Sequence, residues 1–137
     1  MRVLIDLNVI LDVLQDRSPH AEMSARVLAL VETGRVEGCI CAVSFATLDY
    51  ILAKVVDMPT RRRHLRVVHR LLTVAAVDAQ VIDSAINLGW GDFEDAIVHE
   101  SARLAGASAI VTRNLNDYGS ATLRVYSPSE FCAAFNP

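Results

Sequence analysis

The stretch that decides the fold is Val3-Leu4-Ile5-Asp6-Leu7-Asn8-Val9-Ile10-Leu11. The apolar run Arg2–Ile5 is short and has no polar alternation, which is typical of a strand buried on both faces. It ends at Asp6, and a helix is expected over Val9–Gln15. A buried strand followed by a polar residue and then a helix is typical of an α/β protein.

The alternation of strand and helix continues along the chain. Further strands are expected over 38–43, 74–77 and 109–112, with a fifth over 123–126. Helix caps and breakers place helices over 18–34, 44–56, 61–72, 78–89 and 92–106, and a last helix from 127. In this prediction Ser18-Pro19 and Ser44 open helices, and Met58-Pro59-Thr60 separates two of them. The pattern predicts a mostly parallel central sheet of four to five strands with helices on both faces.

The length and composition fit one globular domain. The chain has 137 residues, of which 53% are hydrophobic and 21% charged, so we expect a single domain over 1–137 and exclude a disordered chain. The apolar runs are too short to span a bilayer, and no secretory leader follows Met1, so a cytoplasmic location without membrane partners is expected. Cys39, Cys41 and Cys132 lack CxxC spacing and are expected to be buried thiols.

The net charge argues at first against nucleic acid as a partner. Thirteen basic and sixteen acidic residues give a formal charge of −3. A protein of this charge cannot coat a polyanion by bulk attraction. A nucleic-acid partner therefore requires a local basic patch or a bound cation.

Acidic and polar residues follow several of the predicted strands. Because sites in parallel sheets form beyond the carboxyl ends of the strands, these side chains are expected to converge. Carboxylates that converge repel one another unless a cation neutralises them, and hard oxygen ligands favour Mg²⁺ or Mn²⁺. Such a metal supports phosphodiester hydrolysis. The plainer alternative is that each acid caps a helix or closes a turn. The residues concerned are Asp6, Asp92, Asp95, Thr112, Asn114 and Asp117.

Three segments together resemble the PIN domains. Residues 3–11 resemble the opening pattern hhhDTNhhh, and Asp92-Phe93-Glu94-Asp95-Ala96 with Ile110-Val111-Thr112-Arg113-Asn114-Leu115-Asn116-Asp117-Tyr118 resembles the second half of VapC-like PIN ribonucleases. Tyr126-Ser127-Pro128-Ser129-Glu130-Phe131 is similar to the closing strand and helix of that family. The resemblance implies a PIN-like three-layer α/β/α sandwich. It also implies a Mg²⁺- or Mn²⁺-dependent endoribonuclease, the toxin of a type II toxin–antitoxin pair, with an antitoxin partner and a homodimeric assembly.

The resemblance also implies roles for individual residues. Asp6, Asp95 and Asp117 resemble the metal-binding acids, and Asp92 resembles an outer ligand. Thr112 and Asn114 resemble the polar pair of the last motif. Asn8 resembles the polar residue of the first motif, which orients Asp6 or contacts substrate. These roles concern Asp6, Asn8, Asp92, Asp95, Thr112, Asn114 and Asp117.

Two residues depart from the family pattern. Leu7 stands where a Thr or Ser is usual, and Thr47 stands where the T-x-x-E pattern has a second acid. Asp49 lies about 200° around the helix from Thr47 and cannot take its place in this register. The departures leave an alternative open, a catalytically weak or inactive PIN domain that binds RNA or protein.

Basic residues supply the candidate contacts to RNA. Five arginines lie between 61 and 70, and of these Arg62 and Arg66 are assigned to phosphate contact. A solvated helix face is the plainer interpretation. Arg113 is the better single candidate because it follows a strand beside the acids, although an ion pair with a nearby acid is an equal alternative.

Other residues have plainer interpretations. His99, at i+4 from Asp95, is expected to be exposed or paired with a carboxylate rather than to bind metal. Phe45 and Tyr50 are expected to pack in the core. Trp90 and Phe93 are expected to have a core or staple role, and the alternative is that they stack on an unpaired base. A phospho-receiver domain also has acids at strand ends. It requires a lysine at the end of a strand, however, and the only lysine, Lys54, lies in a predicted helix.

Overall fold

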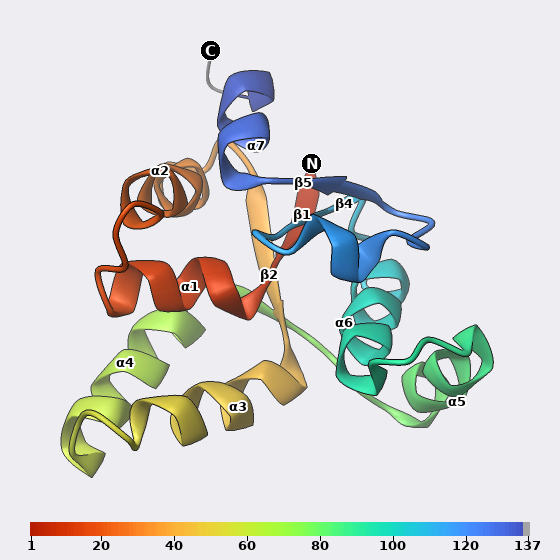
Figure 1. The fold of residues 1–137 in the computed structure, drawn as a ribbon, viewed down its shortest axis with the longest axis horizontal. Helices are drawn as coiled ribbons and strands as arrows, with labels where there is room; N and C mark the ends of the chain where they lie inside the picture. The colour runs from red at the N-terminus through yellow and green to blue at the C-terminus, as the bar shows by residue number, and fades with distance from the viewer. Residues whose placement is uncertain (136–137) are drawn as a thin grey trace.

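Five parallel strands form one sheet at the centre of the molecule (Figure 1). The structure is a computed structural model and describes residues 1–135. The strand order is β3-β2-β1-β4-β5. Strands β2 and β3 are added on one side of β1, and β4 and β5 are then added on its other side. A switch of direction beside β1 is where open α/β sheets form their sites. The strands are β1 (Arg2–Ile5), β2 (Glu37–Cys41), β3 (Thr73–Ala75), β4 (Ala109–Val111) and β5 (Arg124–Tyr126).

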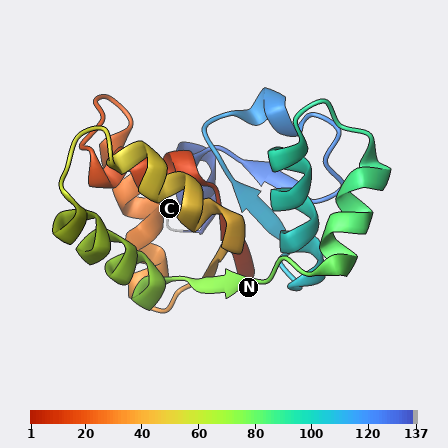
Figure 2. The same ribbon diagram turned by 90° about the horizontal axis from the view of Figure 1, so that it is seen from below.

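Helices cover both faces of this sheet, as Figure 2 shows. In β1, Val3 and Ile5 enter one hydrophobic cluster while Leu4 enters the other. The first cluster is covered by α1 (Leu7–Leu14), α2 (Ala21–Glu32), α3 (Ala42–Leu52), α4 (Met58–Leu71) and α7 (Pro128–Phe135). The second is covered by α5 (Ala79–Leu88) and α6 (Phe93–Leu104), and the 3-10 helix η1 spans Leu115–Tyr118. The predicted three-layer α/β/α sandwich with a parallel sheet is confirmed.

Aspartates cap four of the helices. Asp6, Asp57, Asp78 and Asp92 each accept a hydrogen bond from a backbone N–H of the helix that follows. An unpaired N–H in the first turn is satisfied in this way. The caps predicted for Asp78 and Asp92 are confirmed, as is the capping box in which Ser127 and Glu130 bond to each other's backbone N–H.

Several predicted helix starts are wrong. Helix α1 begins at Leu7 rather than Val9 because Asp6 caps it. Helix α4 begins at Met58, so the predicted break at 58–60 is absent: Pro59 stands in the first turn, where its missing N–H costs nothing. Helix α3 begins at Ala42, two residues before the predicted cap Ser44, and α2 begins at Ala21.

Strand β2 passes close under two helices. A Cβ on Gly38 would lie 2.7 Å from Leu72 Cδ2 and 2.8 Å from Val31 Cγ2, so any larger residue here would force these two side chains to shift. Cys39 and Cys41 are buried free thiols, as predicted, and burial raises the pKa of Cys39 to about 11. Within residues 1–135, the structure contains no helix with the length and hydropathy to cross a bilayer.

Candidate metal and catalytic site

The carboxylate of Asp6 lies at the carboxyl end of the central strand and is held by four donors. Its Oδ1 accepts from the Leu7 N–H at 2.9 Å, and its Oδ2 accepts from Thr112 Oγ1 at 2.8 Å. Asn8 Nδ2 and the Tyr118 hydroxyl also lie 3.4 Å from Oδ2. Burial raises the pKa of Asp6, whereas the bonds from Thr112, Leu7 and Tyr118 lower it. Asp6 is therefore a carboxylate that is fixed in position and partly desolvated.

Thr112 joins the ends of β1 and β4. Its fully buried hydroxyl donates to Asp6, so it must accept the bonds from Asn8 Nδ2 and the Asn114 N–H, both at 3.1 Å. The Asn8 Oδ1 in turn accepts from the Arg113 N–H at 3.1 Å. The structure thus brings Asp6, Asn8 and Thr112 together as predicted, while Asn114 contributes its backbone and exposes its side chain.

Tyr118 links Asp6 to the first turn of α6. Its side chain is 3% exposed, and its hydroxyl lies 3.4 Å from Asp6 Oδ2 and 3.5 Å from Asp95 Oδ1. Burial and the charges of both aspartates raise its pKa, so the phenol keeps its proton. The sequence does not reveal this role, because an aromatic residue at position 118 has the pattern of a core residue.

The charge of Asp117 also acts on the carboxylates of Asp6 and Asp95, and the charge of Asp92 acts on Asp95. Burial raises the pKa of Asp95 to about 7, and the charges of Asp92, Asp6, Asp117 and Glu94 add to the increase. Asp92 Oδ1 accepts from the Asp95 N–H at 3.0 Å, so the predicted cap is real. Asp92 and Asp117 also line an open hollow of about 430 Å³ beside η1. The four predicted acids therefore share one electrostatic environment.

The donor chemistry of this group fits a hard divalent cation. Carboxylate, hydroxyl and amide oxygens are the ligands of Mg²⁺ and Mn²⁺. Within residues 1–135, however, no three His, Cys, Asp or Glu side chains converge on one point. Mg²⁺ keeps several waters and uses one or two protein carboxylates, so three direct ligands are not needed.

The two departures from the family pattern have structural counterparts. Leu7 is buried in the core, and its backbone N–H, rather than a hydroxyl, holds Asp6. Thr47 Oγ1 donates to Glu94 Oε1 at 3.1 Å, so an acid from α6 reaches the position on α3 that lacks one.

Arg113 forms a buried ion pair beside the site. Its Nε donates to Asp12 Oδ2 at 2.6 Å, and Ser24 Oγ donates to the same oxygen at 2.9 Å. Asp12 is fully buried. Of the two predicted alternatives for Arg113, the structure therefore shows the ion pair, which limits how far the guanidinium can turn toward RNA.

Arg62 and Arg66 lie away from the acids. Helices α4 and α6 lie on opposite sides of the central strands in both views (Figures 1 and 2). Both arginines border an open cavity of about 370 Å³ with Phe45. Arg62 is also paired with Asp49 at 2.8 Å, so part of the predicted basic patch is already neutralised.

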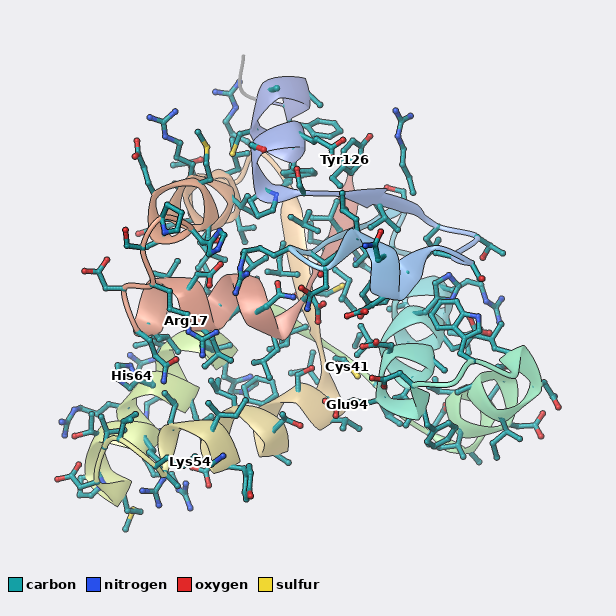
Figure 3. All side chains as sticks on the ribbon, in the orientation of Figure 1. Arg17, Cys41, Lys54, His64, Glu94 and Tyr126 are labelled. Carbon is teal, nitrogen blue, oxygen red and sulfur yellow. The ribbon has the colours of Figure 1, made fainter. Side chains whose placement is uncertain are left out.

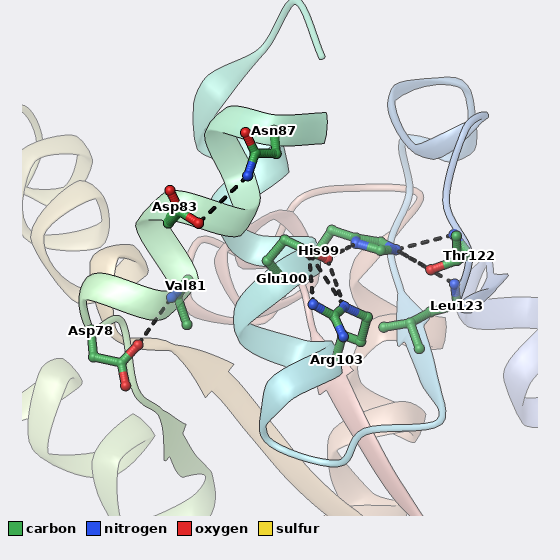
Figure 4. Close-up of polar contacts among 9 residues, drawn as sticks. All are labelled: Asp78, Val81, Asp83, Asn87, His99, Glu100, Arg103, Thr122 and Leu123. Atoms are coloured by element: carbon green, nitrogen blue, oxygen red, sulfur yellow. Dashed lines mark hydrogen bonds and ion pairs between the residues drawn. The ribbon is translucent and has the colours of Figure 1, made fainter. Parts of the chain in front are cut away.

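His99 is part of a separate buried network on α6 (Figure 4). Its Nδ1 lies 2.8 Å from Glu100 Oε2, and its Nε2 lies 3.2 Å from the Thr122 N–H. Both ring nitrogens are therefore engaged, and the predicted pairing with a carboxylate is confirmed. Trp90 packs on this ring with centroids 5.0 Å apart, which agrees with its predicted core role.

Two aromatic predictions are wrong. Tyr50 is 67% exposed because it lies on the outer face of α3, and Phe93 is 44% exposed at the start of α6.

The only lysine, Lys54, lies just after α3 (Figure 3), and its ammonium is 4.9 Å from the ring centroid of Tyr50. A lysine in that place is far from any strand end, which excludes the phospho-receiver alternative.

Replacing Thr112 with valine tests the polar junction. The variant keeps the shape but removes the hydroxyl on which Asp6, Asn8 and the Asn114 N–H depend. Urea unfolding should show a free energy of unfolding lower by about 1–3 kcal/mol. The matched control Thr33→Val removes an exposed hydroxyl and should change stability by less than about 0.5 kcal/mol. Equal stability of the two variants would contradict the role assigned to the Thr112 hydroxyl.

Comparisons with known proteins agree with the geometry. The family model described as PIN domain matches residues 2–116. Ribonuclease VapC1 of Aquifex aeolicus (strain VF5) is 23% identical over an alignment 140 residues long, which covers 98% of this chain and 96% of that protein.

Two solved structures share the fold. VapBC-1 from nontypeable Haemophilus influenzae gives a TM-score of 0.72 at 15% identity over 94% of this chain and 99% of that one. A toxin–antitoxin complex from Klebsiella pneumoniae gives a TM-score of 0.70 at 16% identity over 92% and 97%. The sheet order, the acids at its carboxyl edge and the family match lead to one assignment: the chain belongs to the PIN domain family.

Proposed function

We propose that this protein is a Mg²⁺- or Mn²⁺-dependent endoribonuclease. The observation that carries the proposal is the Tyr118 hydroxyl, which lies 3.4 Å from Asp6 Oδ2 and 3.5 Å from Asp95 Oδ1. The phenol thus lies between acids from the end of β1 and the start of α6, at the switch point of the sheet, and its single O–H donates to one of them at a time. The similarity to Ribonuclease VapC1 supports RNA as the substrate.

Individual residues of the site have separate proposed roles. Asp6 and Asp95 would hold the metal directly, with Asp117 and Asp92 acting from the rim through water. Thr112 and Asn8 fix the Asp6 carboxylate, and Asn114 faces solvent where substrate would enter. When bound, a divalent cation lowers the pKa of water and neutralises charge on phosphate oxygens. Oxygens of the acids would orient a water molecule there. Arg66, which is exposed, is the proposed contact to more distant phosphates, together with Arg62.

The metal requirement is the direct test of activity. A fluorophore–quencher RNA should be cut by the purified protein in Mg²⁺ or Mn²⁺ and left intact in EDTA, and the activity should return when metal is added in excess. The rate in EDTA should fall by about 10³-fold or more, because the metal supplies several kcal/mol of charge stabilisation. Cleavage that persists in EDTA would contradict the proposal.

We also propose an antitoxin partner. The solved structures with this fold include a toxin–antitoxin complex, and a nuclease of this kind requires a means of restraint. Copurification with the product of the adjacent reading frame, and loss of RNA cleavage in the complex, test this proposal. The homodimer implied by the resemblance stays a prediction, which light scattering on the purified protein tests.

A second candidate function rests on Thr47. If the site lacks a needed acid, the protein is a weak or inactive PIN domain that binds RNA or protein, and Thr47→Glu should sharply raise cleavage. If the acid is supplied from elsewhere in the chain, the same variant should not raise it.

A further inference from the structure

The carboxyl end of β2 has no acid of its own that faces the site. The only carboxylate on the following helix, α3, belongs to Asp49, which accepts from Arg61 at 3.2 Å and Arg62 at 2.8 Å. It is therefore engaged with α4. The strands β1 and β4, in contrast, are followed by Asp6 and by the loop that carries Asp117. A carboxylate on the β2 side of the acidic site must therefore come from another element.

Glu94 supplies a carboxylate on that side. Thr47 Oγ1 on α3 donates to Glu94 Oε1 at 3.1 Å, a contact between residues 47 apart in the sequence. Figure 3 shows Glu94 and Cys41 near each other where the start of α3 faces α6. The charge of Glu94 acts on the Cys41 thiol at the end of β2 and also on Asp95. Glu94 is thus held by α3 and acts electrostatically on groups at the end of β2 and at the start of α6.

Helix geometry separates the two acids in the first turn of α6, Glu94 and Asp95, which lie about 100° apart around the helix axis. Asp92 precedes them as the N-cap, with an extended backbone. Asp95 is directed to Tyr118, and Asp92 to the hollow beside η1. Glu94 is directed to α3, where it meets Thr47.

We infer that Glu94, positioned by Thr47, is a further acid of the metal site and replaces the acid that α3 lacks. The inference rests on the proposed metal-dependent function. Glu94 is exposed, so its carboxylate can turn without desolvation cost. The bond from Thr47 limits that freedom and keeps the charge on the side of the site that faces β2. Glu94 acts on the metal directly or through water, and Thr47 acts only through Glu94.

The test measures Mn²⁺ binding without RNA, by electron paramagnetic resonance of free Mn²⁺. Glu94→Gln should raise the Kd for Mn²⁺ by about 10-fold or more, and Thr47→Ala should raise it by less. The matched control Glu32→Gln removes an exposed acid on α2 and should bind as the wild type does. All three changes are at partly or fully exposed positions and should leave the melting temperature unchanged.

A rescue variant separates a metal-site role from general electrostatics. In Thr47→Glu/Glu94→Gln the carboxylate enters the same space from α3, because the two side chains lie 3.1 Å apart in the wild type. The double variant should recover most of the Mn²⁺ affinity. Wild-type affinity in Glu94→Gln, or no recovery in the double variant, would overturn the inference. Metal-dependent RNA cleavage by the wild type would still stand in either case, so the two failures are distinguishable.

Discussion

Replacing Asp95 with asparagine is expected to reduce RNA cleavage by about 10³-fold while making the metal-free protein more stable at pH 8. Cleavage falls because the amide side chain keeps the shape of the carboxylate but loses the charge with which we propose that Asp95 holds the metal. Stability rises because ionising Asp95 in the folded protein is unfavourable: burial, with Asp92, Asp6, Asp117 and Glu94 nearby, raises its pKa to about 7 from an ordinary 3.8.

The sign of the pH dependence follows from the direction of this shift. Between about pH 4 and pH 7 the folded state binds a proton that the unfolded state has released, so the free energy of unfolding falls as the pH rises through this range. Asparagine cannot ionise. The variant should therefore melt about 3–6 °C higher than the wild type at pH 8 in EDTA, a figure reduced for partial exposure. The difference should vanish near pH 4.

The variant Asp83→Asn is the matched control for Asp95→Asn. Asp83→Asn removes an exposed acid on α5 and should alter neither cleavage nor the melting temperature at any pH. A variant Asp95→Asn that is less stable than the wild type at pH 8 would show that the carboxylate is satisfied in the metal-free fold. The fold would then hold the carboxylates near one another without an electrostatic cost.

Replacing Arg113 with glutamine is expected to destabilise the protein by about 3–5 kcal/mol. The loss leaves Asp12 as a charge that is fully buried, with Ser24 Oγ as its remaining donor to Oδ2. The other oxygen, Oδ1, is buried with no hydrogen-bond partner among the described residues. Urea unfolding measures the effect.

The surface pair of Arg26 and Glu22 provides the matched control. Their side chains are 57% and 74% exposed, so Arg26→Gln should cost less than about 1 kcal/mol. The double variant Asp12→Asn/Arg113→Gln should be more stable than Arg113→Gln alone, because the uncompensated charge is gone. If Arg113→Gln unfolds like Arg26→Gln but binds RNA more weakly, Arg113 is an RNA contact rather than a structural partner.

The sheet is predictable because buried parallel strands have a strong local signal. The strands β1, β2 and β4 are short and mostly buried, and β1 and β4 are followed by the polar residues Asp6 and Thr112, which end the apolar run. After β2 the apolar run continues into α3, so the end of that strand is predicted two residues too late. Helix starts are less predictable. Pro59 is equally compatible with a break between helices and with the first turn of a helix, and only the cap formed by Asp57 shows that it stands in the first turn of α4. The exposure of Tyr50 is missed because α3 has apolar residues on several faces, so spacing alone does not identify the buried one.

The site is predictable where neighbouring strands define it. Asp6 and Thr112 follow β1 and β4, and paired parallel strands bring their ends together. Tyr118 and Glu94 are not predictable as site residues. Tyr118 depends on η1, which carries no helix signal, and the meeting of Glu94 with Thr47 depends on how α3 and α6 are placed across the sheet.

The most direct test of the metal site is anomalous diffraction from crystals soaked in Mn²⁺. We expect a peak at the carboxyl end of β1, about 2.2 Å from carboxylate oxygens of Asp6 and Asp95. Glu94, or a water bound to it, should complete one side of the coordination. No peak at this position, or a peak only at another group such as the His99–Glu100 pair, would contradict the proposed metal site.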